Sequence, residues 1–140
     1  MTRAVITCSL LTVLLLFPAI ARAQETEAFA APVDRVWAAT LAALERQGWG
    51  VAQHDCAIGR IVSRSHRLAG SLSVSRRVQL ALSVRTAGDG AARVTVEREI
   101  FDRERVLWIR HDEFVTVHDP LMAGDRALER SLLAAIRHGL

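Results

Sequence analysis

His54, Asp55 and Cys56 are consecutive in the sequence and carry an imidazole, a carboxylate and a thiol. Cysteine nucleophiles in enzymes act with a histidine base and a group that orients this base. Zinc sites use the same kinds of side chain as ligands. His–Asp pairs recur at 111–112 and 118–119. The chemistry open to the chain is therefore thiol-based hydrolysis or metal binding, unless these residues serve only to shape the backbone.

The pattern around the first cluster favours a structural role. Consecutive side chains of a strand point to opposite faces, so His54 and Asp55 diverge while the chain is extended. No glycine-rich elbow surrounds Cys56, and the other histidines lack the paired spacing of zinc ligands, namely His66, His111, His118 and His138. We therefore predict no catalytic residue, no metal ligand and no cofactor. Asp55 and Gly59 are predicted to form a corner between two strands.

Residues 1–23 have the features of a secretory signal peptide. A positive start at Arg3 precedes an apolar segment over 4–21, and Ala21-Arg22-Ala23 fits the small-x-small cleavage pattern. We expect cleavage between Ala23 and Gln24, which leaves residues 24–140 as one domain in the periplasm or outside the cell. The alternative is a retained anchor, because about 20 apolar residues span a bilayer. The cleavage pattern favours the signal peptide, with no stable membrane span after cleavage.

The charge pattern excludes one class of partner. Residues 24–140 contain 16 arginines and 15 acidic residues, a net charge of +1. The arginines alternate with acidic residues, as in "VEREIFDRER" over 96–105, which argues against a polyanion-binding face and hence against nucleic acid. We interpret this segment as a solvated strand face. Cys8 leaves with the leader, so Cys56 has no internal disulfide partner; it could pair with a cysteine of another chain, but we expect its thiol to be buried.

Two helices and an antiparallel sheet are predicted from the hydrophobic periodicity. Pro32 opens a helix whose apolar residues recur every three or four positions, and Gly48 ends it. Residues 24–29 suit an edge strand, and residues 78–84 alternate as in a half-buried strand. Asp119 and Pro120 are expected to start a final helix. The fold class is thus α+β, a two-layer sandwich of four to six antiparallel strands with an N-terminal and a C-terminal helix. The predicted core consists of Trp37, Leu41, Leu44, Trp49, Leu80, Leu82, Leu128 and Leu132.

The segment "PVDRVWAATLAALERQGWGVAQHDCAIGRIVSR" resembles the small domains of Gram-negative outer-membrane lipoproteins related to the assembly-machine subunit BamC. The resemblance lies in "PVDRVW", in "QGWGV", and in Asp55, Gly59, Arg60 and Ile61. It implies a helix-grip-like fold, in which Asp55 and Gly59 are turn residues. The chain has no lipobox, so lipid attachment is not expected. A weaker resemblance, carried by "APVDRVWAAT", is to the Bet v1-like ligand-binding family, whose helix and sheet enclose a hydrophobic cavity.

Three functions are compatible with these features. We favour a non-enzymatic exported domain that contacts one or more envelope proteins. The first alternative is a periplasmic carrier of a small apolar ligand, and the second is a Cys/His hydrolase. The interior between helix and sheet distinguishes the first two, because a cavity of at least about 300 Å³ there would favour the carrier.

Overall fold

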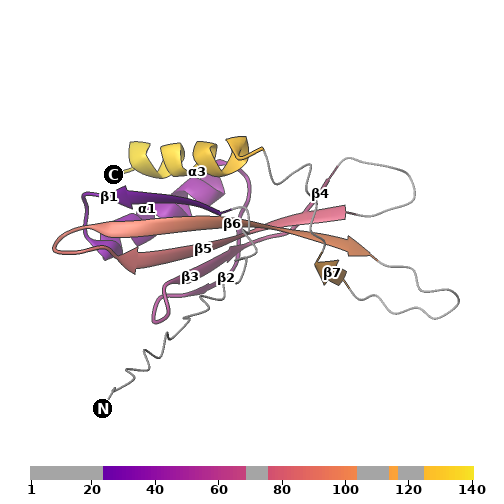
Figure 1. Cartoon of the computed structure of the whole chain (residues 1–140), viewed down its shortest axis with the longest axis horizontal. Coiled ribbons are helices and arrows are strands. Elements are labelled where there is room, and N and C mark those ends of the chain that lie inside the picture. Colours follow the sequence, from indigo (N-terminus) through magenta and orange to yellow (C-terminus); the bar gives the residue numbers. More distant parts are fainter. Residues whose placement is uncertain (1–23, 69–75, 104–113, 117–124) are drawn as a thin grey trace, which may run out of the picture.

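The structure, a computed structural model, describes residues 24–68, 76–103, 114–116 and 125–140. Its elements follow one another along the chain as shown in Figure 1. They are β1 (Gln24–Phe29), α1 (Val33–Arg46), β2 (Val51–Asp55), β3 (Arg60–Ser63), β4 (His66–Arg67), β5 (Arg76–Thr86), β6 (Ala92–Arg103), β7 (Phe114–Thr116) and α3 (Ala127–His138). The predicted signal peptide and the predicted helix start at Asp119 and Pro120 lie outside the described residues.

The described strands form one antiparallel sheet in the order β1-β6-β5-β3-β2, with β4 beside β5 and β7 beside β6. Without the two-residue β4, six strands remain, which is the upper end of the predicted range. The α+β class, the antiparallel sheet and a helix near each end of the sheet-forming region are confirmed. The edge strand β2 carries a register shift between Val51 and Gln53, a bulge that is typical of exposed edges.

The long hairpin of β5 and β6 defines the two faces of the sheet. Leu82 pairs with Val96, and both are buried, whereas their neighbours Ala81 and Glu97 are half-buried on the other face. We call the face of Leu82 and Val96 the inner face and the face of Ala81 and Glu97 the outer face. The alternation predicted for residues 78–84 is confirmed, because their even-numbered members are buried.

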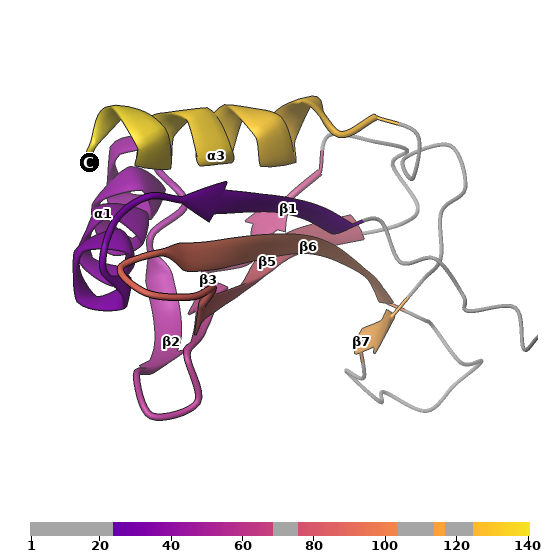
Figure 2. The same ribbon diagram turned by 60° about the vertical axis from the view of Figure 1, so that its left-hand side comes forward.

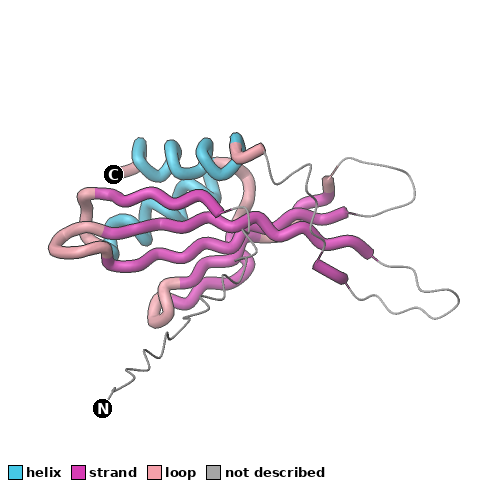
Figure 3. Tube along the Cα trace, in the orientation of Figure 1, coloured by secondary structure: helices cyan, strands magenta, loops and turns pink. Residues whose placement is uncertain are grey.

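Both helices lie on the inner side of the sheet (Figures 2 and 3). Helix α3 contacts β1 and β6, helix α1 contacts β2, β5 and β6, and the two helices contact each other. One cluster of buried side chains joins them to the sheet, and its large, fully buried members include Val36, Leu44, Ile61, Leu80, Val96, Leu132 and Ile136. Among the described residues, no helix is long and apolar enough to cross a membrane.

Half of the predicted core residues are fully buried. Leu44, Leu80, Leu82 and Leu132 are at most 2% exposed, as expected. Four other residues are less buried than predicted. They are half-buried and pack against the edge of the cluster, namely Trp37, Leu41, Trp49 and Leu128. For Trp37 and Leu41 the reason is the orientation of α1, whose buried face is formed by Val36, Ala39, Thr40, Ala43 and Leu44. Trp37 consequently faces the sheet edge, where its ring meets His54 of β2 edge-on.

The chain turns between Asp55, the last residue of β2, and Gly59, the residue before β3, where the sequence predicts a corner. The Asp55 carboxylate accepts a hydrogen bond of 2.9 Å from the Ala57 amide, which closes the turn. Gly59 has a φ of +65°, and a Cβ atom added to it would lie 2.2 Å from the Val84 carbonyl oxygen. The Gly59 carbonyl also accepts a 2.8 Å hydrogen bond from the Val84 amide. Only glycine fits this close approach of the turn to β5.

We expect Gly59→Ala to destabilise the domain much more than Gly48→Ala. Both glycines have positive φ, so each alanine carries the left-handed backbone cost of about 1–2 kcal/mol. A Cβ at position 48 meets no atom within 4 Å, whereas a Cβ at position 59 must push the β5 backbone away. Urea denaturation of both variants measures the difference. Equal losses of unfolding free energy would show that the turn does not sit against β5 as described.

Candidate functional site

The structure separates the side chains of the His54–Asp55–Cys56 cluster. His54 pairs with the buried Ile61 and therefore lies on the inner-face side of β2, where it meets the ring of Trp37. Asp55 pairs with Arg60 on the outer-face side, and its carboxylate is engaged by the Ala57 amide. The predicted divergence of His54 and Asp55 is thus confirmed. A Cys–His–Asp arrangement for nucleophilic catalysis requires these groups to converge, which this register does not allow.

Cys56 differs from the expectation in its burial. The thiol is exposed in the turn and not packed into the core. Cys56 opens the turn between β2 and β3, where Ala57 and Ile58 are exposed as well. In the part of the chain that the structure describes, no group of three or more histidine, cysteine, aspartate or glutamate side chains is arranged to hold a metal ion. The pairs at 111–112 and 118–119 lie outside that part.

The outer face of the sheet is a surface that the described helices leave uncovered. No described helix or strand packs on it, whereas the inner face is closed by α1 and α3 (Figure 2). Three transverse rows of side chains cross its centre. The middle row holds Arg60, Ser83 and Thr95, which pair across β3, β5 and β6. Arg85 and Arg93 pair in the row on one side, and Val62, Ala81 and Glu97 form the row on the other.

One hollow lies on this outer side, and a second lies at the edge of the sheet, where it includes His54 as well as outer-facing residues. The first has a volume of about 350 Å³ and spans the middle of the sheet between Arg60 and Arg85 at one end and Glu97 and Glu99 at the other. The second, of about 730 Å³, lies along the edge strand β2 and reaches Val62 of β3. Both are lined by Ile58 and Arg60, which therefore stand at their common rim. Neither lining includes a residue of α1 or α3.

Ile58 differs from the other large apolar side chains because it is exposed to solvent. It is 52% exposed and is the only large hydrophobic side chain so exposed among the residues that the structure describes. It sits in the turn between β2 and β3, at the rim of both hollows. A single exposed apolar residue is common on protein surfaces, and Ile58 is distinguished only by its position at the rim of both hollows.

Three arginines surround the Ile58 end of the outer face. Arg85 and Arg93 are directly opposite each other on β5 and β6, and Arg60 lies diagonally to Arg85 on β3. Like charges in opposite positions destabilise a sheet. Arg85 donates a 3.2 Å hydrogen bond to the Ser83 hydroxyl. Within the described residues, neither Arg60 nor Arg93 forms an ion pair.

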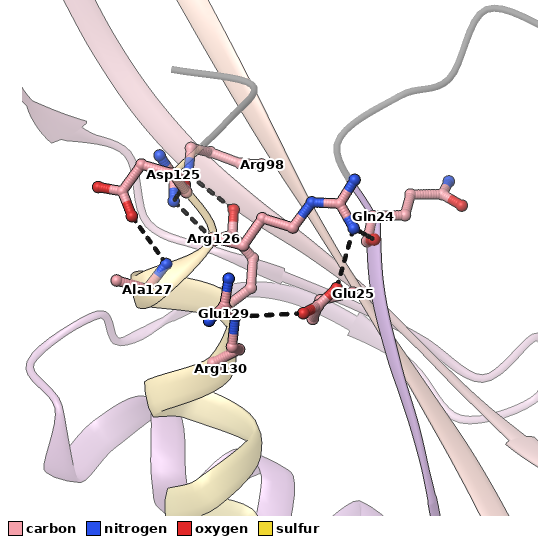
Figure 4. Close-up of polar contacts among 8 residues, drawn as sticks. All are labelled: Gln24, Glu25, Arg98, Asp125, Arg126, Ala127, Glu129 and Arg130. Carbon is pink, nitrogen blue, oxygen red and sulfur yellow. Dashed lines mark hydrogen bonds and ion pairs between the residues drawn. The ribbon is translucent and has the colours of Figure 1, made fainter. Parts of the chain in front are cut away.

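A second polar group lies on the inner face and is structural. Arg98 of β6 and Glu129 of α3 form a two-pronged ion pair, with Nε–Oε1 and Nη2–Oε2 distances of 2.7 and 2.6 Å (Figure 4). Arg98 also donates a 2.9 Å hydrogen bond to the Asp125 carbonyl oxygen. Glu129 is 1% exposed and Arg98 is 10% exposed. This pair fixes the start of α3 over β6.

The interpretation of residues 96–105 as a solvated strand face was wrong for Arg98, which lies on the buried face opposite Leu80. Two signals could have found the pair. Arg98 interrupts the run of inward apolar residues that includes Val96 and Ile100, and Glu129 stands three and seven residues before the buried Leu132 and Ile136. Each of these charged residues stands at a position where the pattern of its strand or helix places an apolar side chain. Because the two charges are opposite in sign, the pattern indicates a buried ion pair.

Further ion pairs fasten α3 to the edge strand β1. Glu25 on the helix-facing side of β1 bonds Arg126 at 3.1 Å and lies 3.4 Å from Arg130 (Figure 4). Farther along, Arg137 donates to the Glu27 carboxylate. These three arginines follow one face of α3, so a row of charges follows β1. The side chains are partly exposed, and the row therefore orients the helix more than it stabilises it.

Comparison with known proteins gives little further guidance. No protein-family model matches the chain, and no curated protein matches it. Among solved structures, the chain is similar to a DUF4468 family protein from Bacteroides ovatus, at 13% sequence identity and a TM-score of 0.32. The alignment covers 83% of this chain and 78% of that chain. At this level of similarity, the neighbour identifies neither a fold family nor a function.

Proposed function

We propose that the chain is a non-catalytic protein-interaction module of the cell envelope, exported to the periplasm, which binds its partner on the outer face of the sheet. The observation that carries the proposal is the contrast between the two faces. The inner face is closed by a packed core, whereas the outer face is uncovered by described elements and bears an exposed apolar anchor, Ile58. A protein interface combines an apolar contact with room for the partner's side chains, and Ile58 at the rim of two hollows offers both.

The charges on this face define the chemistry of the partner. Arg60 and Arg85 line the same hollow as Ile58, and Arg93 pairs with Arg85 on the next strand, β6, so the partner presents a carboxylate beside an apolar side chain. Glu97 and Glu99 line the other end of the same hollow. A uniformly anionic partner, such as nucleic acid or an acidic membrane surface, would meet repulsion there. A protein surface with both charge signs fits better.

The same proposal covers the arrangement of the layers. We assign the domain to a two-layer, helix-grip-like sandwich of the kind found in the BamC-related envelope domains. Support comes from the position of both helices on one side of the sheet and from the single core that they share with it. In such an arrangement the outer face is the natural place for a partner, because the helices already occupy the other face.

The carrier alternative gains no support from the described hollows. A carrier of apolar ligands would hold its ligand between the helices and the sheet, in an apolar cavity of several hundred cubic ångströms. The hollow of about 350 Å³ lies instead on the outer side and that of about 730 Å³ along the edge strand β2, and arginine and acidic side chains contribute to their linings. They suit a protein surface.

Site-specific photo-crosslinking in the periplasm tests this function. A photoreactive amino acid at Ile58 should give an adduct with a discrete protein, whereas the same group at Ala38, exposed on α1, should give none. Arg93→Glu should abolish the Ile58 adduct, and Arg64→Glu, an exposed arginine that lines neither hollow, should preserve it. Equal adducts at both positions, or an Ile58 adduct that persists in Arg93→Glu, would contradict the proposal.

A further inference from the structure

We infer that the protein bound by the outer face is a second copy of this chain, in a face-to-face dimer with twofold symmetry. This inference rests on the proposed function, which makes the outer face a protein interface. It goes further by naming the partner. The observation behind it is that one outer face contains two complementary sets of groups. One set is the arginine cluster with Ile58, and the other is a carboxylate beside apolar side chains, which is what we expect the partner to present.

The charges on β6 have the order that a twofold axis requires. The outer-facing residues Arg93, Thr95 and Glu97 are successively positive, neutral and negative. When two outer faces meet with their β6 strands antiparallel and the axis passes over Thr95, Arg93 of each copy lies over Glu97 of the other. A symmetric interface repeats every contact, so two complementary pairs form. With the β6 strands parallel and in register, the like charges would coincide.

The same axis brings the apolar groups together. The axis runs along the middle row of Arg60, Ser83 and Thr95. It therefore places the row on one side of each copy over the row on the other side of the second copy. The Gly59–Val84 hydrogen bond places Ile58 next to Arg85 in one of these rows. Val62 and Ala81 stand at the matching places in the other row. Each Ile58 is thus carried over Ala81 and Val62 of the second copy, and because Val62 is already only 9% exposed, the apolar surface that the contact buries comes mainly from the two Ile58 side chains.

The middle row is compatible with close approach. Ser83 and Thr95 are small, and the Thr95 hydroxyl lies 3.1 Å from that of Thr26 on β1. The hollow of about 350 Å³ extends over Ser83 and Thr95 and leaves room for side chains of the opposing face. Arg60 lies near its own symmetry mate, but its neighbour in the row is Asp55, so each Arg60 reaches Asp55 of the other copy. The charges of this row are therefore compensated as well.

A charge-exchange experiment tests the dimer with the mature protein recovered from the periplasm. Sedimentation velocity should give twice the chain mass for the wild type. Arg93→Glu and Glu97→Arg each place like charges in contact and should weaken association at least tenfold. An equimolar mixture of the two variants should recover the double mass, because in the mixed dimer the two introduced charges, which are opposite in sign, face each other across the interface. Arg64→Glu is the matched control and should leave the wild-type dimer intact.

The outcomes separate this inference from the function on which it rests. A wild-type protein that sediments as a monomer at all concentrations up to about 100 times those of the crosslinking experiment overturns the dimer. So does a mixture that stays monomeric while both variants retain the wild-type melting temperature. If the Ile58 adduct then contains a different protein, the interaction function stands and only the second copy is wrong. If no protein adduct forms at Ile58, both fail.

Discussion

Glu129→Gln is expected to lower the free energy of unfolding by about 3–5 kcal/mol. The carboxylate of Glu129 is 1% exposed and holds the guanidinium of Arg98 through two short hydrogen bonds. Glutamine has nearly the same shape, but it leaves the buried Arg98 without a compensating charge. Arg98→Met should cost a similar amount, because it strands the carboxylate instead. Urea denaturation of the two variants gives these values.

The double variant distinguishes a buried ion pair from ordinary packing. Replacing both partners with apolar residues, as in Arg98→Met with Glu129→Leu, removes both desolvated charges at once. Such replacements are often neutral or stabilising by about 1–4 kcal/mol. We therefore expect the double variant to be at least as stable as the better single variant, with strong non-additivity. Arg130→Gln, which removes an exposed partner of Glu25, serves as the control and should cost at most about 1 kcal/mol. Additive losses at Arg98 and Glu129 would contradict the described pair.

Leu44→Ala is the second substitution for which we expect a large effect, a loss of about 2–5 kcal/mol. Leu44 is fully buried at the centre of the contact between α1 and the sheet, and the truncation leaves a cavity in the core. With no internal disulfide available to residues 24–140, the domain depends on this core. The loss is therefore a large share of the about 5–15 kcal/mol typical of a domain.

Trp37→Ala is the informative comparison. The sequence pattern places Trp37 in the centre of the core, where its removal would cost about 3–5 kcal/mol. In the structure it is half-buried at the sheet edge beside His54. We now expect a smaller loss for Trp37→Ala than for Leu44→Ala, measured as the difference in urea midpoints at unchanged slope. The reverse order would place the centre of the core at Trp37.

The elements of the fold could be predicted because each has a strong local signal. Pro32 and Gly48 bracket α1, which runs from Val33 to Arg46, and the alternation over 78–84 marks β5. The depth of burial could not be read in the same way. Two faces of a helix that differ by a small rotation contain most of the same apolar residues. Only packing against the sheet decides which of these residues lies at the centre of the core. The half-buried position of Trp37 follows from that choice.

The local geometry of the His54–Asp55–Cys56 segment was predictable, and the surface that we assign to binding was not. Strand alternation separates His54 from Asp55, and glycine at position 59 marks the turn. The outer face becomes a candidate only once the helices are known to cover the opposite face. Its central row draws Arg60, Ser83 and Thr95 from three strands, so no short sequence pattern could have indicated it.

Native mass spectrometry of the protein recovered from the periplasm tests the central claim, an exported interaction module with a closed interior, most directly. We predict a chain that begins at Gln24, carries no small molecule, and is present as an assembly of protein chains. The same spectrum gives the mass of the chain, which shows whether the leader is removed. It also gives the mass of any bound small molecule and of any assembly of protein chains. A monomer that retains residues 1–23, or one that carries a stoichiometric apolar ligand, would contradict the account.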